Sequence, residues 1–177
     1  AEQVPAVHRI WLDFAAELAW HRWASCNVIT LRADDYGLAT RRTRVFLIAT
    51  RTRVPDFTGM PIRAWWRTGR FEAPWEPAPQ AWTPFARTTM AHVLGWPAGV
   101  RVNTRGNRKT SGGNEFIADG VAPSLTGRAR SWYRTDLGSQ AGKLTAAQAG
   151  LLQGFRADYP WQGSRTSQFQ QVADSVP

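Results

Sequence analysis

A continuous apolar run at residues 45–50 constrains the fold of this chain most strongly. A run of this length is typical of a strand that is buried on both faces. A second strand-like segment, residues 27–33, precedes it across a short connection, residues 34–40, which contains Gly37. Such a short connection predicts that the two strands are antiparallel neighbours or form a hairpin-like edge.

A helix is predicted ahead of these strands. Apolar residues recur at helical spacing over residues 7–19, and Pro5 stands just before them. A second helix is predicted near the end of the chain, where Thr145 and Gln148 have the spacing of a capping box and Gly154 ends the apolar face. Helix, strand, short loop and strand together indicate the close of an α/β sheet.

Residues 55–124 interrupt this regular pattern. Seven of the eleven prolines lie between Pro55 and Pro97, and only residues 89–94 suggest a short helix. We therefore expect an irregular, loop-rich module after the sheet. The predicted organisation is a sheet-forming part (1–54), an inserted module (55–142) and a return segment that packs on the first part (143–177).

Positive charge is concentrated in the middle of the chain. Residues 41–134 carry 16 Lys and Arg against 5 Asp and Glu, whereas residues 1–40 carry 3 against 5. The excess is almost all arginine and is interleaved with tryptophan, which favours nucleic acid as the partner. An ordinary solvated surface is the alternative interpretation of such a segment.

Several classes of protein are disfavoured by composition. No apolar run approaches the roughly 20 residues that span a bilayer, and no secretory signal is visible. The single cysteine, Cys26, excludes an internal disulfide and a cysteine-rich zinc site, and His8, His21 and His92 lack metal-ligand spacing. We expect a cytoplasmic protein with neither a membrane nor a metal as partner.

Two arginines, Arg42 and Arg44, stand directly before the apolar run. Alone, they fit an ordinary charged strand entrance. With the preceding Tyr36-Gly37 turn, however, they resemble the Gln-x-Arg-x-Arg motif of DNA cytosine-5 methyltransferases. Thr40 stands in the place of the motif's glutamine.

Further segments resemble the same family in the same order. Glu2-Gln3-Val4 is similar to its Glu-Asn-Val motif, and residues 122–126 are similar to the motif that braces the target-recognition region. Residues 144–160 and 172–177 resemble the closing segments, in which Asp174, Ser175 and Val176 correspond to the S-adenosylmethionine pocket. Residues 103–106 and 112–116 are reminiscent of bacterial and phage members.

The resemblance implies an α/β fold, namely the C-terminal part of a Rossmann-like methyltransferase sheet followed by a small target-recognition domain at 55–142. It also implies methyl transfer from S-adenosylmethionine to C5 of a cytosine flipped out of double-stranded DNA, as in restriction-modification. Glu2 is then expected to contact N3 of the cytosine, and Arg42 and Arg44 to hold the base, its backbone or the neighbouring groups. Candidate DNA contacts, chosen by charge and loop context, are Arg63, Arg67, Arg70, Arg101, Arg105, Arg108, Lys109 and Arg128.

The family's nucleophile, a cysteine in a Pro-Cys motif upstream of Glu2, is not among these residues. Cys26 follows Glu2 in the chain and is expected to be a buried structural cysteine. We therefore expect a fragment that needs the missing N-terminal portion of the enzyme for activity. A non-catalytic DNA-binding module and a relative that modifies RNA are the alternatives.

Overall fold

Two compact units make up the chain, whose computed structural model describes residues 1–70, 72–77, 85–104 and 115–176. The first unit comprises Ala1–Tyr36 and Thr43–Phe85. The second comprises Gly37–Arg42 and Ala86–Pro177. Residues 37–42, which connect two strands of the first unit, thus belong to the second unit.

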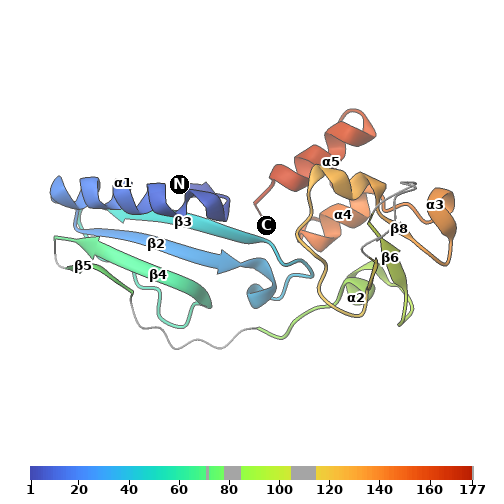
Figure 1. Cartoon of the computed structure of the whole chain (residues 1–177), viewed down its shortest axis with the longest axis horizontal. Helices are drawn as coiled ribbons and strands as arrows, with labels where there is room; N and C mark the ends of the chain where they lie inside the picture. Colours follow the sequence, from blue (N-terminus) through green and yellow to red (C-terminus); the bar gives the residue numbers. More distant parts are fainter. Residues whose placement is uncertain (71, 78–84, 105–114, 177) are drawn as a thin grey trace. The chain divides into compact units, whose positions relative to one another are not determined.

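An antiparallel sheet of five strands forms the first unit (Figure 1). Its order is β1-β3-β2-β4-β5, and every neighbouring pair is antiparallel. These strands are β1 (Glu2–Gln3), β2 (Ser25–Arg32), β3 (Thr43–Thr50), β4 (Ile62–Gly69) and β5 (Glu72–Pro77). The predicted C-terminal part of a Rossmann-like, parallel sheet is therefore wrong.

The Rossmann-like sheet was expected from the family resemblance, and the strand at Glu2–Gln3 was not predicted. Helix α1 (His8–Trp20) connects β1 to β2. β1 and β2 do run in the same direction, but β3 lies between them and pairs antiparallel with both. The antiparallel pairing of β2 with β3 was predicted and is confirmed, with Ser25 opposite Thr50.

The second strand pair of the sheet lies where an irregular module was predicted. β4 pairs along β2, with Trp66 opposite Val28, and β5 pairs with β4. The prediction of irregular structure is thus wrong for residues 62–69 and 72–77. The compact units also divide the chain at other positions than 54 and 142, and the roles given to the predicted segments stay predictions.

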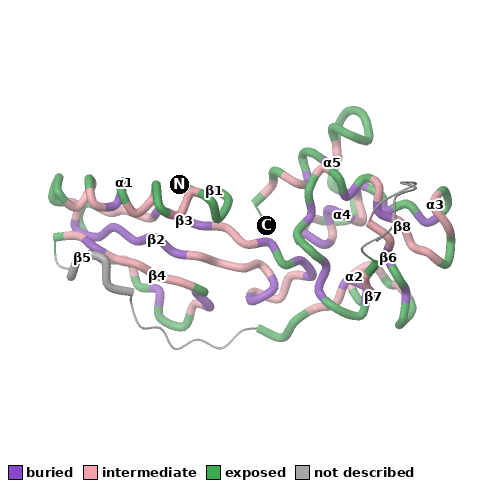
Figure 2. Tube along the Cα trace, in the orientation of Figure 1, coloured by how far each residue is buried: buried purple, intermediate pink, exposed green. Residues whose placement is uncertain are grey.

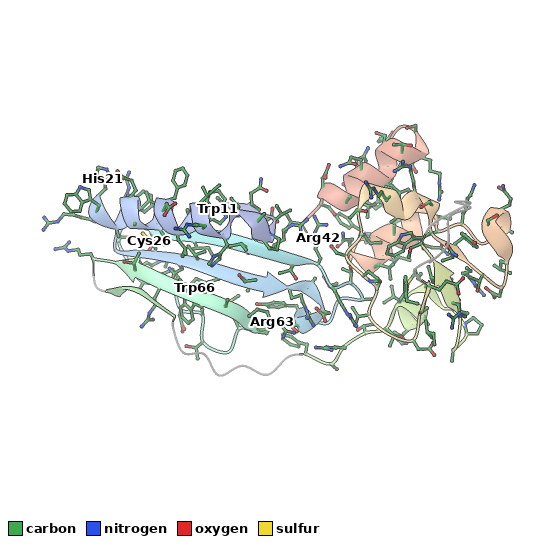
Figure 3. The ribbon with its side chains drawn as sticks, viewed as in Figure 1. Trp11, His21, Cys26, Arg42, Arg63 and Trp66 are labelled. Atoms are coloured by element: carbon green, nitrogen blue, oxygen red, sulfur yellow. The ribbon has the colours of Figure 1, made fainter. Side chains whose placement is uncertain are left out.

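Alternation along the strands places one apolar set on each face of the sheet. On one face, Cys26, Val28, Val45 and Leu47 pack against α1. The predicted apolar stripe of this helix is confirmed in part, because Ile10 and Phe14, which were assigned to it, are 52% and 54% exposed. Trp11, Cys26 and Trp66 belong to this layer (Figure 3). β2 is the most buried strand of the unit (Figure 2), as its place between β3 and β4 requires.

The other face of the sheet is covered by the connection between β3 and β4. Phe57 from this connection packs against Ile29 and Ile62, and its ring meets the edge of Trp65 at 5.4 Å between centroids. Trp65 in turn donates from Nε1 to Oδ1 of the buried Asn27 at 3.1 Å. Val45 and Leu47, on the helix face of β3, are buried, whereas Phe46 and Ile48 on the other face are half-buried. The prediction of a strand buried on both faces is therefore confirmed for one face.

The second unit combines short helices with a small sheet. The strands β6 (Arg101–Asn103), β7 (Glu115–Ile117) and β8 (Tyr133–Arg134) form an antiparallel sheet in the order β7-β6-β8. The helices are α2 (Met90–Leu94), α3 (Gly138–Ala141), α4 (Ala146–Leu152) and α5 (Arg165–Asp174). The predicted capping box begins α4: Gln148 donates its backbone N–H to Oγ1 of Thr145 at 3.1 Å, and Thr145 donates to Oε1 of Gln148 at 2.9 Å.

Helix α1 ends in a turn that normally requires glycine. Arg22 has a φ of 61°, in the left-handed region, and donates its N–H to Ala19 at 2.9 Å. The next residue, Trp23, donates to Leu18 at 3.1 Å. This pair of bonds is the Schellman motif, in which glycine is the usual residue at the position of Arg22.

Replacement of Arg22 by glycine is expected to stabilise the protein. The left-handed conformation costs an L-residue roughly 1–2 kcal/mol, whereas the extra freedom of an unfolded glycine costs about 0.5–1 kcal/mol. The free energy of unfolding in urea should rise by roughly 0.5–1 kcal/mol. A decrease of that size in the free energy of unfolding would show that the Arg22 side chain stabilises the fold by more than the left-handed conformation costs.

Candidate functional site

The paired strands β1 and β3 bring Glu2 and Arg44 together. Glu2 lies opposite Phe46 in the register, so Arg44 is its diagonal neighbour on the same face. Nε of Arg44 lies 2.7 Å from Oε1 of Glu2, and the two side chains are only 15% and 25% exposed. The two residues, predicted from separate motifs 42 positions apart in the chain, therefore form one ion pair.

The ion pair leaves hydrogen-bonding capacity on the carboxylate. Oε1 of Glu2 is buried and, within the part of the chain that the structure describes, accepts no hydrogen bond of good geometry. Arg44 also donates from Nη1 to the carbonyl of Thr43 at 2.8 Å, which fixes its guanidinium. An ionised carboxylate has about four acceptor positions over its two oxygens, so Arg44, which contacts Oε1, does not use all of them.

Arg42, the other arginine of the motif, belongs to the second unit and is 2% exposed (Figure 3). The segment that carries it pairs with the predicted bracing segment. Arg41 donates its backbone N–H to Ala122, and Ala122 donates to Ala39, each at 2.9 Å. Thr40, which replaces the motif's glutamine, donates from Oγ1 to the carbonyl of Pro123 at 3.4 Å.

Two of the candidate DNA contacts on β4 have partners inside the protein. Arg63 makes two hydrogen bonds to the carboxylate of Asp35, whose side chain is fully buried. Arg67 lies over the ring of Trp65, with 5.4 Å between the guanidinium carbon and the centroid. Arg70 is exposed just after the same strand. DNA contact by these residues stays a prediction, and for Arg63 the geometry describes a role in folding.

The remaining candidates differ in how far the structure describes them. Arg101 on β6 forms an ion pair with Glu115 on β7, with Nε and Oε2 3.1 Å apart. Arg128 is exposed in the turn 127–131. Arg105, Arg108 and Lys109 lie outside the described residues.

The predicted cofactor residues form an exposed helix end. Asp174 closes α5 and accepts two hydrogen bonds from Nε2 of Gln170, both at 2.9 Å. Ser175 donates to the carbonyl of Val172 at 2.8 Å, and Val176 is 49% exposed. Asp174 and Val176 are exposed and Ser175 is half-buried, and the assignment of these residues to S-adenosylmethionine stays a prediction.

A buried charge network was missed by sequence reasoning. Arg32 on β2 binds both oxygens of Asp34, each at 2.5 Å, and lies 3.9 Å from Asp35, the partner of Arg63. Burial and the nearby carboxylate of Asp35 raise the pKa of Tyr36 in the same turn. Two adjacent acids after a strand were the available signal, but the partner Arg63 lies 28 residues further along.

Cys26 is fully buried and burial raises the pKa of its thiol. The thiolate is the nucleophilic form, so both burial and pKa oppose a catalytic role. Among the described residues, no group of three or more His, Cys, Asp and Glu is placed to hold a metal ion. Nor does any described helix have the length and apolar character to cross a membrane.

Labelling of Cys26 by a thiol reagent should therefore require unfolding. We expect the native protein to react at a rate that follows its opening, and the reaction to become fast in concentrated urea. The rate is measured by absorbance of the released chromophore or by mass spectrometry. Rapid, stoichiometric labelling of the native protein would contradict the buried position.

Comparison with known proteins adds no family assignment. No protein-family model matches the chain, and a search of curated proteins finds no relative. The functional argument therefore depends on the motifs and on the geometry of their residues.

Proposed function

We propose that this chain supplies the base-binding and DNA-recognition residues of a DNA cytosine-5 methyltransferase. The contact between Glu2 and Arg44 carries the proposal, because it joins the two motifs whose residues the resemblance assigns to the target cytosine. The proposal is argued from the residues of the site and not from the fold class, which is corrected above.

Methylation of cytosine requires a carboxyl group that is held beside the base. Cytosine must leave the duplex stack, at a cost of a few kcal/mol, before its ring can react. Glu2 then contacts N3, where sharing or donating a proton makes C6 more electrophilic toward a cysteine thiolate. Arg44 orients the carboxyl group. In the complete reaction S-adenosylmethionine supplies the methyl group, and the nucleophile comes from a segment other than these 177 residues.

The charge distribution supports DNA as the partner. Residues 41–134 have a net charge of +11, and arginine predominates there. Each phosphate contact by such residues releases counterions and makes affinity depend on salt. A non-catalytic DNA-binding module is the second candidate, and the replacement of motif residues at Gln3, Thr40 and Asp174 favours it.

Binding to nucleic acid is tested by competition. A labelled DNA duplex is titrated with the chain by fluorescence anisotropy at several salt concentrations, against unlabelled duplex DNA and structured RNA. We expect duplex DNA to compete better, with a salt slope of about −0.9 for each phosphate contacted. Preference for RNA would support an RNA-modifying relative instead.

Catalytic descent is tested by complementation. The chain is mixed with an amino-terminal methyltransferase segment that carries the Pro-Cys motif and the glycine-rich cofactor loop. Restored methyl transfer supports the enzyme proposal. DNA binding without any gain from a well-folded partner segment supports the non-catalytic module.

A further inference from the structure

A concave site of about 600 Å³ lies at the end of α1, on the first unit. Its lining comes from the last turn of the helix, the Schellman turn and the end of β3. The lining residues are Leu18, His21, Arg22, Trp23 and Arg51. None of them was a predicted functional residue, and none takes part in the contact between Glu2 and Arg44.

The fold fixes the backbone of one arginine of this site and the side chain of the other. Arg22 occupies the left-handed position of the Schellman turn, where glycine would be less strained. Arg51 lies over the ring of Trp23, with 4.9 Å between its guanidinium carbon and the ring centroid. A guanidinium stacked on a ring keeps its edge N–H groups available for an anion.

The charges in the site are not neutralised from within. Within the described part of the chain, neither Arg22 nor Arg51 has a carboxylate within ion-pair distance. His21 is the only lining residue with an acidic partner, since its Nε2 lies 3.1 Å from Oε1 of Glu17. One cation near a helix C-terminus is expected from the helix dipole, but two unpaired guanidinium groups around a hollow indicate a bound anion.

We propose that this site binds a phosphate group of the duplex DNA backbone. Guanidinium groups bind phosphate oxygens through paired, charge-assisted hydrogen bonds, and Trp23 orients one of the two groups. The choice of DNA as the source of the phosphate rests on the proposed function. Arg44 and Arg51 are seven positions apart on and just beyond β3, or roughly 23 Å at about 3.3 Å per residue. The site is therefore a binding contact remote from the cytosine.

The variant Arg22→Gly gives a test that misfolding cannot imitate. It removes the guanidinium and relieves the turn, so DNA affinity should fall while resistance to urea rises. Arg51→Gln should also weaken binding. Because the two arginines share one phosphate, each change should make the slope of log affinity against log salt less steep, by at most about 1. Arg9→Gln, at the exposed first turn of the same helix, is the matched control and should leave the slope unchanged.

A second arm follows the indole N–H signal of Trp23 by NMR during titration with inorganic phosphate and with duplex DNA. Movement with both, abolished in Arg22→Gly, supports the site as proposed. If the Trp23 signal moves with inorganic phosphate but the chain binds no DNA, the hollow is a phosphate site. That result overturns DNA as the source of the phosphate and, with it, the proposed function. Unchanged DNA affinity and salt slope in both arginine variants overturn the site and leave the proposed function standing. No response to either probe overturns the site.

Discussion

Replacement of Arg63 by methionine is expected to lower the free energy of unfolding by about 3 kcal/mol. Arg63 neutralises Asp35 through two hydrogen bonds, and the side chain of Asp35 has no exposure to water. Methionine keeps much of the volume but leaves the buried carboxylate with Arg32, at 3.9 Å, as its neighbouring cation among the residues that the structure describes. Removing one partner of a buried pair typically costs 3–5 kcal/mol. We take the lower end because Arg63 is 31% exposed.

Urea unfolding monitored by circular dichroism measures this loss. Arg128→Met removes an exposed arginine and should change stability by less than about 0.5 kcal/mol. The double variant Asp35→Asn with Arg63→Met removes both charges and should recover part of the loss. A loss below about 1 kcal/mol for Arg63→Met alone would mean that the pair behaves like a surface contact.

Truncation of Phe169 to alanine should destabilise the second unit by about 3–5 kcal/mol. Phe169 is fully buried in α5 and belongs to the unit's main apolar cluster with Leu125, Leu144 and Leu152. The guanidinium of Arg165 lies 4.7 Å from its ring centroid. Loss of the ring would leave a cavity and remove this contact.

Arg165, the residue that lies over the Phe169 ring, also connects two segments of the unit by hydrogen bonds. Arg165 donates from Nη2 to the carbonyl of Arg130 at 2.8 Å and to that of Leu144 at 2.6 Å, and burial lowers its pKa. Truncation of the ring should loosen these bonds, so amide hydrogen exchange should rise around residues 130–132 and 144. Leu137→Ala, at a side chain that is 51% exposed, is the control and should have little effect. Equal destabilisation by both variants would contradict the assigned core.

Local patterns in the sequence predicted several elements correctly. The spacing of apolar residues gave α1, the β-branched run gave β2, and Thr145 with Gln148 gave the start of α4. Each of these signals lies within one segment of the chain. The antiparallel pairing of β2 and β3 also followed from a local feature, the short connection between them.

Long-range pairing could not be predicted in the same way. No local pattern in residues 62–69 indicates that they pair with β2. The surrounding prolines also made this segment look irregular, although it is a strand with one tryptophan on each face of the sheet. The position of β3 between β1 and β2 likewise depends on tertiary packing. The family resemblance therefore implied a Rossmann-like sheet where an antiparallel one exists.

The candidate site shows the same division. The resemblance led us to expect that Glu2 and Arg44 act together on the base, which stays a prediction, and the structure shows that the two side chains form an ion pair. Charge alone selected Arg63, whereas the structure pairs it with Asp35, because charge does not reveal which arginines have buried partners. The Schellman turn at Arg22 has no sequence signal, since glycine is the residue that normally marks it.

Transfer of tritium-labelled methyl groups to DNA tests the central claim most directly. The chain is combined with an amino-terminal segment that carries the Pro-Cys motif, and the labelled base is identified after digestion of the DNA. We predict label in 5-methylcytosine, and a decrease of about 100-fold or more when Glu2 is replaced by glutamine, as expected for loss of an acid–base group. Label in 5-methylcytosine that is unaffected by Glu2→Gln would contradict the assigned role of Glu2, and no label with a well-folded partner segment would contradict the enzyme proposal.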